Sequence, residues 1–463
     1  MTPTGVTPQR TLSIVPIDTP SLGDRSYLVH DGSVAFVVDP QRDIDRVLEV
    51  LDREGLSLTH VFETHVHNDY VTGGLALARE TGAAYLLNGR DEVAFDREPL
   101  HDGQSLGIGD RIRVEVVATP GHTFNHLSYV LHDRHSGQGL AVFSGGSLLY
   151  GSTGRPDLLG EEHTDRLARL QHGSARRLRE LLPDDALLYP THGFGSFCSA
   201  TQSDAAESTI GMERSTNPVL LHDEDTYVRQ LLEGLGDWPA YYVHMASLNS
   251  AGPERPDLTF PREATPEEIR RRVDAGEWVV DLRNRTAFAA GHVPGSFNFG
   301  LDGSFATNLG WLFDWGTPIT LLGELPEHVS QAQRELVRIG IDRPVAAATG
   351  GPGQWSDREP AAFGQADFRR LAEVLRERPV VVLDVRRTDE FEAGHIEGAV
   401  NAPLHELRSS DLPGGELWIH CQSGYRASVA ASLLAAAGRD VVAVDDHFGE
   451  AAGAGLTVTS GGA

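Results

Sequence analysis

The carboxy-terminal half of the chain contains one segment twice. Residues 279–298, VVDLRNRTAFAAGHVPGSFN, match residues 382–401, VLDVRRTDEFEAGHIEGAVN, without a gap and at a constant offset of about 103 residues. Within the match Asp281 aligns with Asp384, and the arginine two positions later, the phenylalanine and the Gly-His pair also recur. A match of this length predicts two homologous domains. This half of the chain is therefore expected to fold as two copies of one architecture behind a different first domain.

Three domains are expected in all. Residues 1–255 alternate apolar, strand-like runs such as AFVVD and RVEVVATPGH with polar helical stretches, a pattern typical of a layered α/β domain. A proline-rich linker follows, and a helix should begin near Thr265. The two repeats then occupy residues 262–350 and 364–463, with GGPGQWSDREPAAFG as the linker between them.

Composition restricts the partners and the compartment. A formal net charge of −27 would repel nucleic acid and anionic membranes, so neither is expected as a partner. The sequence has no apolar stretch of about eighteen residues, and its start, MTPTGVTPQR, lacks the apolar core of a signal peptide. Two cysteines are too few for a disulfide framework, which favours a reducing, cytoplasmic location. The oligomeric state, including a homo-oligomer, is left open.

The second repeat ends in a cysteine motif with chemical meaning. The apolar strand ELWIH runs into CQSGYRAS and then into an alanine-rich helix, so Cys421 stands between a strand end and a helix amino terminus. The free N–H groups and the positive dipole end of such a helix stabilise an anion on the sulfur. Arg426 adds a positive charge to the same loop. The alternative is a buried, inert cysteine.

This text, Cys-x-x-Gly-x-Arg preceded by DVR and GHIEGA, resembles the rhodanese (sulfurtransferase) family over the whole second repeat. The resemblance implies that Cys421 accepts a sulfane sulfur as a persulfide and passes it to a thiol, with Arg426 as a second catalytic residue. The implied substrate cradle consists of the residues after the cysteine: Gln422, Ser423, Gly424 and Tyr425. The first repeat has GELPEH where the nucleophile should lie, so the middle domain is expected to be a catalytically silent rhodanese-like domain.

Three loops of the first domain carry histidines directly after apolar, strand-like runs. The strand before the first loop should end at Thr64, and a helix should start near Tyr70. Any one of these histidines alone would more often be structural, but three such loops in one domain predict a metal site. The candidate ligands are His65, His67 and Asp69 in THVHNDYVTGG, His122 in TPGHTFNH and His192 in YPTHGFGSFC.

These motifs, together with FSGGSLLYGSTGRPDL, resemble the metallo-β-lactamase fold, and within it the persulfide dioxygenases. The whole chain resembles the persulfide dioxygenase–rhodanese fusion proteins, which implies an αββα sandwich followed by two α/β rhodanese-like domains with parallel sheets. In that family one iron is held by the first histidine, the Pro-Gly-His histidine and an aspartate. Here Gly146 stands where the aspartate should be, and Tyr70 replaces the last histidine of the superfamily motif.

The two substitutions favour one metal ion over two, because a dinuclear hydrolase needs both missing ligands. The remaining candidates form a face of His65, His67 and His122, with Asp69 accepting a ring N–H from a ligand. Fe(II) is favoured for this face and Zn(II) is the alternative. If this alignment is right, an aspartate restored at Gly146 should tighten iron binding.

Two further residues of the first domain are candidates for substrate binding. Arg155 matches an arginine near the family's active site and could anchor a carboxylate of a glutathione-like thiol, although a surface arginine is the alternative. Cys198 lies six positions after His192 and is either a persulfide relay or a buried structural thiol.

The resemblance implies an enzyme of persulfide and sulfide metabolism. A low-molecular-weight persulfide would be oxidised by O₂ to sulfite at the metal, while Cys421 moves sulfane sulfur between thiosulfate and a thiol. Two alternatives stay open: a sulfurtransferase whose first domain is degenerate, and a mononuclear zinc hydrolase of the glyoxalase II type.

Overall fold

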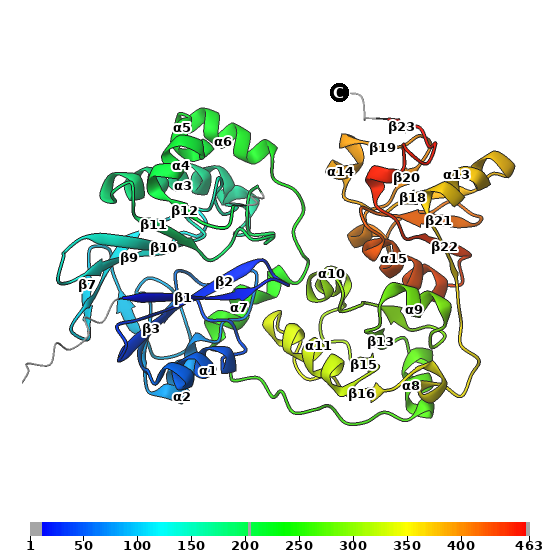
Figure 1. Cartoon of the computed structure of the whole chain (residues 1–463), viewed down its shortest axis with the longest axis horizontal. Coiled ribbons are helices and arrows are strands. Elements are labelled where there is room, and N and C mark those ends of the chain that lie inside the picture. The colour runs from blue at the N-terminus through cyan, green and yellow to red at the C-terminus, as the bar shows by residue number, and fades with distance from the viewer. Residues whose placement is uncertain (1–11, 202–204, 460–463) are drawn as a thin grey trace, which may run out of the picture. The chain divides into compact units, whose positions relative to one another are not determined.

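The computed structural model describes residues 12–201 and 205–459. The chain divides into two compact units: Met1–Pro256 with Val337–Gly340, and Asp257–Leu336 with Ile341–Ala463. Figure 1 colours the first unit from blue to green and the second from green to red. In the described residues, no helix combines the length and the apolar character needed to cross a membrane.

The first unit is built on two six-stranded sheets that face each other. In the first sheet the strands lie side by side in chain order; the outer pairs β1–β2 and β2–β3 are antiparallel and the rest are parallel. Its strands are β1 (Ser13–Thr19), β2 (Asp24–His30), β3 (Val34–Val38), β4 (Ser57–Phe62), β5 (Ala84–Asn88) and β6 (Glu98–Leu100).

The second sheet has the order β12-β11-β10-β9-β8-β7, and only β10 and β11 run parallel. Its strands are β7 (Ser105–Ile108), β8 (Ile112–Ala118), β9 (Leu127–Asp133), β10 (Gly139–Gly145), β11 (Leu187–Pro190) and β12 (Ser208–Thr209). The inner faces of both sheets contribute the central core, where aromatic rings meet across the layers: Phe36 contacts Phe143 at 6.0 Å and Phe62 contacts Tyr129 at 4.9 Å between ring centroids.

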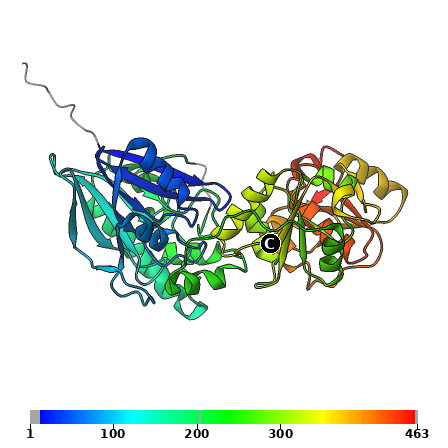
Figure 2. The same ribbon diagram turned by 90° about the horizontal axis from the view of Figure 1, so that it is seen from below.

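Helices cover the outer face of each sheet (Figures 1 and 2). α1 shows why: Val47, Val50 and Leu51 recur at helical spacing and are buried against the first sheet, and Gly55 ends the helix with φ of 64°. The layering is therefore αββα, as the resemblance implies. The helices of this unit are α1 (Asp45–Glu54), α2 (Gly74–Thr81), α3 (Glu161–Leu181), α4 (Ile210–Thr216), α5 (Pro218–Leu221), α6 (Glu224–Glu233) and α7 (Tyr242–Ala251).

The second unit contains two parallel sheets, ordered β14-β13-β15-β16 and β17-β22-β21-β18-β20. The first belongs to the middle repeat and the second to the carboxy-terminal repeat. The middle repeat comprises α8 (Pro266–Asp274), β13 (Trp278–Asp281), α9 (Arg285–Ala290), β14 (Phe297–Asn298), α10 (Phe305–Leu312), β15 (Ile319–Gly323), α11 (Pro326–Arg338), β16 (Ala346–Thr349) and α12 (Pro352–Trp355).

The carboxy-terminal repeat follows the same plan. It also contains one antiparallel pair of short strands, β19 with β23. Its elements are β17 (Gly364–Ala366), α13 (Phe368–Glu377), β18 (Val381–Asp384), α14 (Thr388–Ala393), β19 (His395–Ile396), β20 (Val400–Asn401), the 3₁₀ turn Leu404–Glu406, β21 (Leu417–His420), α15 (Tyr425–Ala436), β22 (Val441–Val444), the 3₁₀ turn Phe448–Glu450 and β23 (Val458–Thr459).

The two repeats preserve individual hydrogen bonds as well as sequence. The Arg283 side chain donates three hydrogen bonds, from Nε and Nη2, to the carboxylate of Asp281, and Arg386 does the same to Asp384, with matching distances of 2.6–3.1 Å. Each arginine also donates to the carbonyl of the glycine in its Gly-His pair. The repeat in the sequence is therefore a repeat of the fold.

Three local expectations can be compared with the fold. The helix expected near Thr265 begins at Pro266 with Thr265 as its cap, whose hydroxyl accepts a hydrogen bond from the N–H of Glu268. The helix expected near Tyr70 begins only at Gly74, because Thr72 is held in an extended bridge with Gln41.

The stretch predicted as the second linker is not a linker throughout. It contains α12, and Trp355 at the end of this helix is buried in the core of the middle repeat. Gly and Pro residues around it suggested a linker, but one large apolar side chain in such a stretch is enough to anchor it in a core.

Candidate metal centre and cysteine loop

Three imidazoles from three loops meet inside the first unit. His65 follows β4, His122 follows β8 and His192 follows β11, and all three are at most 1% exposed. One ligand-capable nitrogen of each lies within 4.8 Å of the others. Their Nε2 atoms are buried and have no hydrogen-bond partner in the described part of the chain. Buried polar atoms are rarely left unpaired, so three that converge point to a missing ligand.

The other ring nitrogen of each histidine is held by a different kind of group. Such contacts fix the ring orientation and direct Nε2 into the centre, as is usual for metal-binding histidines. The contacts are His65 Nδ1 to Thr64 Oγ1 (2.9 Å), His122 Nδ1 to the carbonyl oxygen of Arg155 (2.8 Å) and His192 Nδ1 to Asp24 Oδ1 (3.0 Å).

These residues fit a divalent metal ion. Burial lowers the pKa of His65 well below its ordinary value and that of His122 to about 3, so both imidazoles are neutral, as a ligand must be. For His192 burial acts in the same direction, but the charges of Asp69 and Asp24 outweigh it and raise its pKa to about 10. Metal binding at Nε2 would therefore displace a proton from His192.

Asp69 lies beside this centre. Its Oδ2 is 3.0 Å from His192 Nδ1, and neither of its carboxylate oxygens has a partner with hydrogen-bond geometry. A second, overlapping group of potential ligands consists of His67, Asp69 and His192. The structure thus places one carboxylate at the edge of the three-histidine face, where it can orient a ligand or contact an ion.

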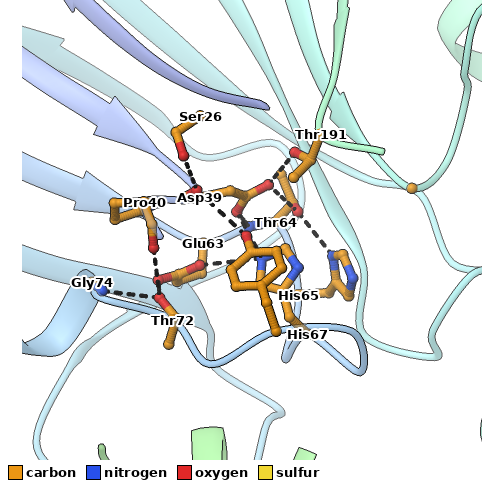
Figure 3. Close-up of polar contacts among 12 residues, drawn as sticks. Ser26, Asp39, Pro40, Glu63, Thr64, His65, His67, Thr72, Gly74 and Thr191 are labelled. Atoms are coloured by element: carbon orange, nitrogen blue, oxygen red, sulfur yellow. Dashed lines mark hydrogen bonds and ion pairs between the residues drawn. The ribbon is translucent and has the colours of Figure 1, made fainter. Parts of the chain in front are cut away.

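The structure groups His192, rather than His67, with His65 and His122, while His67 forms a second group with Asp69 and the same His192. The Nε2 atom of His67 lies 3.2 Å from Asp39 and 3.3 Å from Glu63, and Tyr70 Oη lies 3.0 Å from it. Figure 3 shows His67 between these two carboxylates. Burial opposes protonation of His67, but Asp39 and Glu63 outweigh it and raise its pKa to about 9. Nε2 of His67 is therefore engaged in a buried ion pair, whereas its Nδ1 has no hydrogen-bond partner in the described residues and belongs to the group with Asp69 and His192.

Asp39 ties the ends of three strands together beside the histidines (Figure 3). Its carboxylate accepts hydrogen bonds from the N–H and the hydroxyl of Thr64, both at 2.7 Å, and from the hydroxyl of Thr191 at 2.5 Å. Burial would raise the pKa of Asp39, but His67 and these donors hold it at about 2. The ionised Asp39 thus fixes the loops that carry His65 and His192 from both sheets.

Gly146 is required by the position of His122. A Cβ atom on Gly146 would lie 2.3 Å from Cδ2 of the His122 ring, and the Gly146 N–H donates to His126 Nε2 at 3.0 Å. The place of the family's aspartate is therefore taken by an imidazole edge. The expectation that an aspartate at position 146 would tighten metal binding is wrong for this arrangement, because the side chain has no room.

Arg155 is not a substrate anchor in this structure. It is 3% exposed, and its guanidinium donates to the carboxylate of Asp157 at 2.7 Å and to the carbonyls of Phe197 and Gly236. Its contribution to the centre is its own carbonyl, which orients His122. The sequence could not predict this contact, because every residue has a backbone carbonyl.

Cys198 is buried, with no exposed surface. Burial, followed by the charges of Asp69 and Asp24, raises the pKa of its thiol well above the ordinary value. A relay needs a thiolate, so the arrangement favours the structural alternative for Cys198.

The second cysteine lies where the sequence places it. Cys421 follows β21 directly and precedes α15, and it is 1% exposed. Gly424, the residue before α15, has φ of 88°, a value that favours glycine and permits the tight turn. Ser423 is exposed and Gln422 is half-buried. The loop therefore sets the sulfur at the amino terminus of a helix, where unpaired N–H groups stabilise an anion.

Arg426 lies in the first turn of α15 and is paired. Its Nη1 and Nη2 donate to both carboxylate oxygens of Glu390 at 2.6 and 2.7 Å. Burial lowers the pKa of Arg426, but Glu390 and then Cys421 and Asp384 raise it above the ordinary value. Arg426 thus remains charged beside the cysteine while Glu390 holds its orientation.

The middle repeat has a glycine in place of the nucleophile. Asp281 pairs with Leu322 across β13 and β15, and Asp384 pairs with His420 across β18 and β21. The residue after each strand position is then Gly323 in one repeat and Cys421 in the other. This register supports the prediction that the middle repeat is a catalytically silent rhodanese-like domain.

Family models match each part of the chain. The metallo-beta-lactamase superfamily matches residues 24–192, and the rhodanese-like domain matches residues 265–358 and 368–451. The hydroxyacylglutathione hydrolase of Aeromonas hydrophila is 34% identical over 208 residues, 42% of this chain and 74% of that protein. The chain belongs to the metallo-β-lactamase superfamily and continues into two rhodanese-like domains.

Two further proteins resemble this metallo-β-lactamase–rhodanese chain. The human protein "Persulfide dioxygenase ETHE1, mitochondrial" is 28% identical over 242 residues, 52% of this chain and 80% of that protein. A metallo-beta-lactamase structure from Staphylococcus aureus matches with a TM-score of 0.65 and 27% identity, covering 73% of this chain and 99% of that one. The latter match extends beyond the first unit and supports the fused architecture.

Sequence reasoning missed four acidic residues around the two sites. Asp24 and Asp39 lie after or within early strands, far in sequence from the histidines, and nothing local marks them. Glu63 stands two positions before His65, so its proximity was a usable signal. The four are Asp24, Asp39, Glu63 and Glu390.

Proposed function

We propose that this protein is an enzyme of persulfide metabolism with two chemical centres. A metal-dependent centre at His65, His122 and His192 oxidises a low-molecular-weight persulfide with O₂, and Cys421 transfers sulfane sulfur between thiosulfate and a thiol. The observation that carries the oxidative part is the convergence of three buried Nε2 atoms without partners. The persulfide dioxygenase relative and the two rhodanese-like domains support sulfur chemistry in the same chain.

The oxidation balances without a further cofactor: RSSH + O₂ + H₂O gives RSH + SO₃²⁻ + 2 H⁺. A divalent metal held by the three imidazoles would supply a Lewis-acidic centre with open positions for a sulfur anion and O₂. His65, His122 and His192 would bind that ion, and Asp24 and the carbonyl of Arg155 keep two of these rings in place. Asp69, ionised because His192 outweighs the effect of burial on its pKa, is an acceptor beside the centre, 3.0 Å from His192 Nδ1.

The donor set is compatible with two ions. Fe(II) is favoured for O₂ chemistry, and Asp69 offers the carboxylate that the glycine at position 146 cannot. Zinc suits a neutral three-histidine set equally well.

Sulfur transfer at Cys421 also balances. The thiolate of Cys421 attacks the outer sulfur of thiosulfate, the S–S bond breaks and sulfite leaves with the electron pair: Cys–S⁻ + S₂O₃²⁻ gives Cys–S–S⁻ + SO₃²⁻. A thiol then removes the outer sulfur as its own persulfide. The N–H groups at the start of α15 stabilise the persulfide anion, and Arg426 adds a fixed positive charge.

The proposal is tested by metal analysis of the purified chain combined with oxygen uptake on glutathione persulfide. Iron bound at about one ion per chain, together with oxygen uptake and sulfite formation, is the expected result. Sulfur transfer from thiosulfate is measured in the same preparation as an independent signal. A chain that binds metal and consumes no oxygen would contradict the oxidative half only.

A zinc hydrolase is the second candidate for the first unit. It is favoured by the hydroxyacylglutathione hydrolase relatives, which reach 35% identity, and by the histidine set. Zinc in the purified chain with cleavage of a glutathione thioester would establish it. Sulfur transfer without bound metal or oxygen uptake would instead support a sulfurtransferase with a degenerate first domain.

A further inference from the structure

The middle repeat has no nucleophile, yet it contacts the loop and helix that carry Cys421. Its Asn298 receives a hydrogen bond from Ser428 of α15 at 2.8 Å, and its N–H donates to Ser432 at 3.0 Å. Tyr425, the first residue of α15, donates its hydroxyl to the carbonyl of Gly300 at 2.8 Å. The helix whose amino terminus faces the sulfur is thus packed against the silent domain.

One cation of the silent domain lies against the cysteine loop. Arg285, at the start of α9, donates from Nε to Asp445 at 2.5 Å and from Nη1 to Asp302 at 3.2 Å. A Cβ atom on Gly424 would lie 3.0 Å from Nε of Arg285. The guanidinium is therefore in van der Waals reach of the turn that follows Cys421.

The charge of Arg285 acts on the same loop. Burial lowers its pKa, but the hydrogen bond to Asp445 and the charges of Asp445, Asp302 and Cys421 raise it above the ordinary value. Its side chain is 29% exposed, so the group is also open to solvent. An anion that enters the loop from solvent meets this charge.

The two arginines near the cysteine differ in how their guanidinium groups are held. Arg426 is fixed against one carboxylate, that of Glu390, by a bidentate pair through Nη1 and Nη2. In the described residues, the hydrogen bonds of Arg285 use Nε and Nη1 and leave Nη2 without a protein partner. Arg285 therefore has donors available for an incoming ligand.

We infer that Arg285 is a specificity-determining residue of the Cys421 site, through which the silent domain selects a small dianionic sulfur donor such as thiosulfate. Asp302 weakens this selection, because it places a carboxylate beside the same guanidinium. The inference rests on the proposed sulfur transfer at Cys421. It gives the middle repeat a function despite the loss of its own cysteine.

The test uses two variants with opposite electrostatic effects. Arg285→Gln removes the positive charge and should raise the KM for thiosulfate about five- to tenfold with little change in kcat. Asp302→Asn removes a negative charge from the same place and should lower that KM about twofold. Both variants break the ion pair, so a purely structural role would shift KM in the same direction for both.

The matched control is Arg408→Gln. Arg408 also joins the two repeats, through an ion pair with Asp314 at 2.7 Å, but neither residue belongs to the cysteine loop. It should leave the KM for thiosulfate unchanged. The persulfide of 2-mercaptoethanol, which carries one negative charge near neutral pH where thiosulfate carries two, is the comparison donor, and its KM should rise less than that of thiosulfate in Arg285→Gln.

An unchanged KM for thiosulfate in Arg285→Gln, equal shifts in the Arg285 and Asp302 variants, or an equal loss with both donors would overturn the inference while leaving sulfur transfer intact. If the wild type takes no sulfur from thiosulfate and mass spectrometry finds none on Cys421, the proposed sulfur transfer fails and the inference fails with it.

Discussion

At the scale of single residues, the metal centre depends on the group that contacts Nδ1 of each imidazole. The three histidines turn Nε2 inward because a hydroxyl, a backbone carbonyl and a carboxylate occupy Nδ1. His67 comes from the same loop as His65 but faces two carboxylates instead. Position in the motif therefore does not determine whether a histidine binds metal; its buried neighbours do.

The first prediction separates His192 from His67. His192→Ala removes one of three ligands and should weaken metal binding by at least about 100-fold, measured by competition with a chromophoric chelator. His67→Ala should weaken it less. It should instead destabilise the chain by about 3–5 kcal/mol in urea unfolding, because Asp39 and Glu63 lose their cation.

His60→Ala serves as the control, because this partly buried histidine on β4 belongs to neither group. It should change metal affinity little. Equal losses of metal in the His67 and His192 variants would show that the face includes His67 after all.

The second prediction concerns Gly146. Gly146→Asp should lower metal occupancy rather than raise it, because its Cβ alone collides with the ring of His122. Gly146→Ala carries the same Cβ without the carboxylate and should cause a similar loss. Tighter iron binding in Gly146→Asp, measured by the same chelator competition, would mean that His122 can move aside for a carboxylate ligand.

Residue types and spacing were enough to predict part of this centre. His65, His122 and His192 each follow a strand and could be found from the sequence. The contact of His67 Nε2 with Asp39 could not, because Asp39 lies far from His67 in the sequence and approaches it only in the fold. Arg155 misled for a related reason: its partners are mostly backbone carbonyls, which any residue supplies.

At the scale of elements, the helix pair α14 and α15 is joined by one ion pair beside the cysteine. Glu390 is the third residue of α14 and receives both Nη groups of Arg426 from α15. α14 thus fixes the orientation of Arg426, which the sequence analysis assigns to the cysteine loop alone. α14, which the sequence analysis did not assign to the cysteine site, therefore takes part in that site through Glu390.

The third prediction follows from the pKa of Glu390. Burial raises this pKa, but Arg426 outweighs it and lowers it below the ordinary 4.5. A carboxylate with a lowered folded-state pKa adds stability that is complete above its unfolded value and disappears as the pH falls through the folded value. Glu390→Gln should therefore cost about 1 kcal/mol near neutral pH and progressively less below about pH 4.5.

The measurement is the urea midpoint of unfolding for both chains across this pH range. Glu373→Gln is the control, because Glu373 forms an exposed pair with Arg370 on α13. It should show no difference at any pH. A Glu390→Gln deficit that persists unchanged in acid would contradict the assigned ion pair.

Elements were more predictable than their ends. The ungapped repeat predicted two homologous sheets, and the cap at Thr265 predicted the start of α8. The start of α2 was missed by four residues because a tertiary bridge to Gln41 keeps Thr72 extended. Trp355 was missed because glycine and proline around it resemble a linker. In both cases contacts from distant segments overrode the local pattern.

At the scale of the whole molecule, one chain carries two centres with separate requirements. The metal centre lies entirely in the first unit, and Cys421 lies in the second. Neither set of side chains includes a residue of the other. If both proposed activities act on the same sulfur compounds, their location in one chain would raise the local concentration of a shared intermediate.

The fourth prediction is reciprocal loss. Cys421→Ser should abolish sulfur transfer from thiosulfate and leave oxygen consumption on glutathione persulfide largely intact. Removal of the metal with a chelator should abolish oxygen consumption and leave sulfur transfer intact. The measurements are an oxygen electrode and a thiosulfate–thiol assay on the same samples. Loss of both activities after either treatment would contradict separate centres.

Gly323, at the position that Cys421 occupies in the other repeat, limits the number of sulfur atoms that one chain can carry. The middle repeat has the same buried Asp–Arg pair and sheet as the carboxy-terminal repeat but no thiol at this position, and burial raises the pKa of the enclosed Cys198 thiol. Each molecule can then hold a single transferable sulfur atom at a time, with no internal hand-over from one duplicate to the other. Each catalytic cycle would therefore move one sulfur atom, and this atom must pass from Cys421 to an external acceptor before Cys421 can accept another.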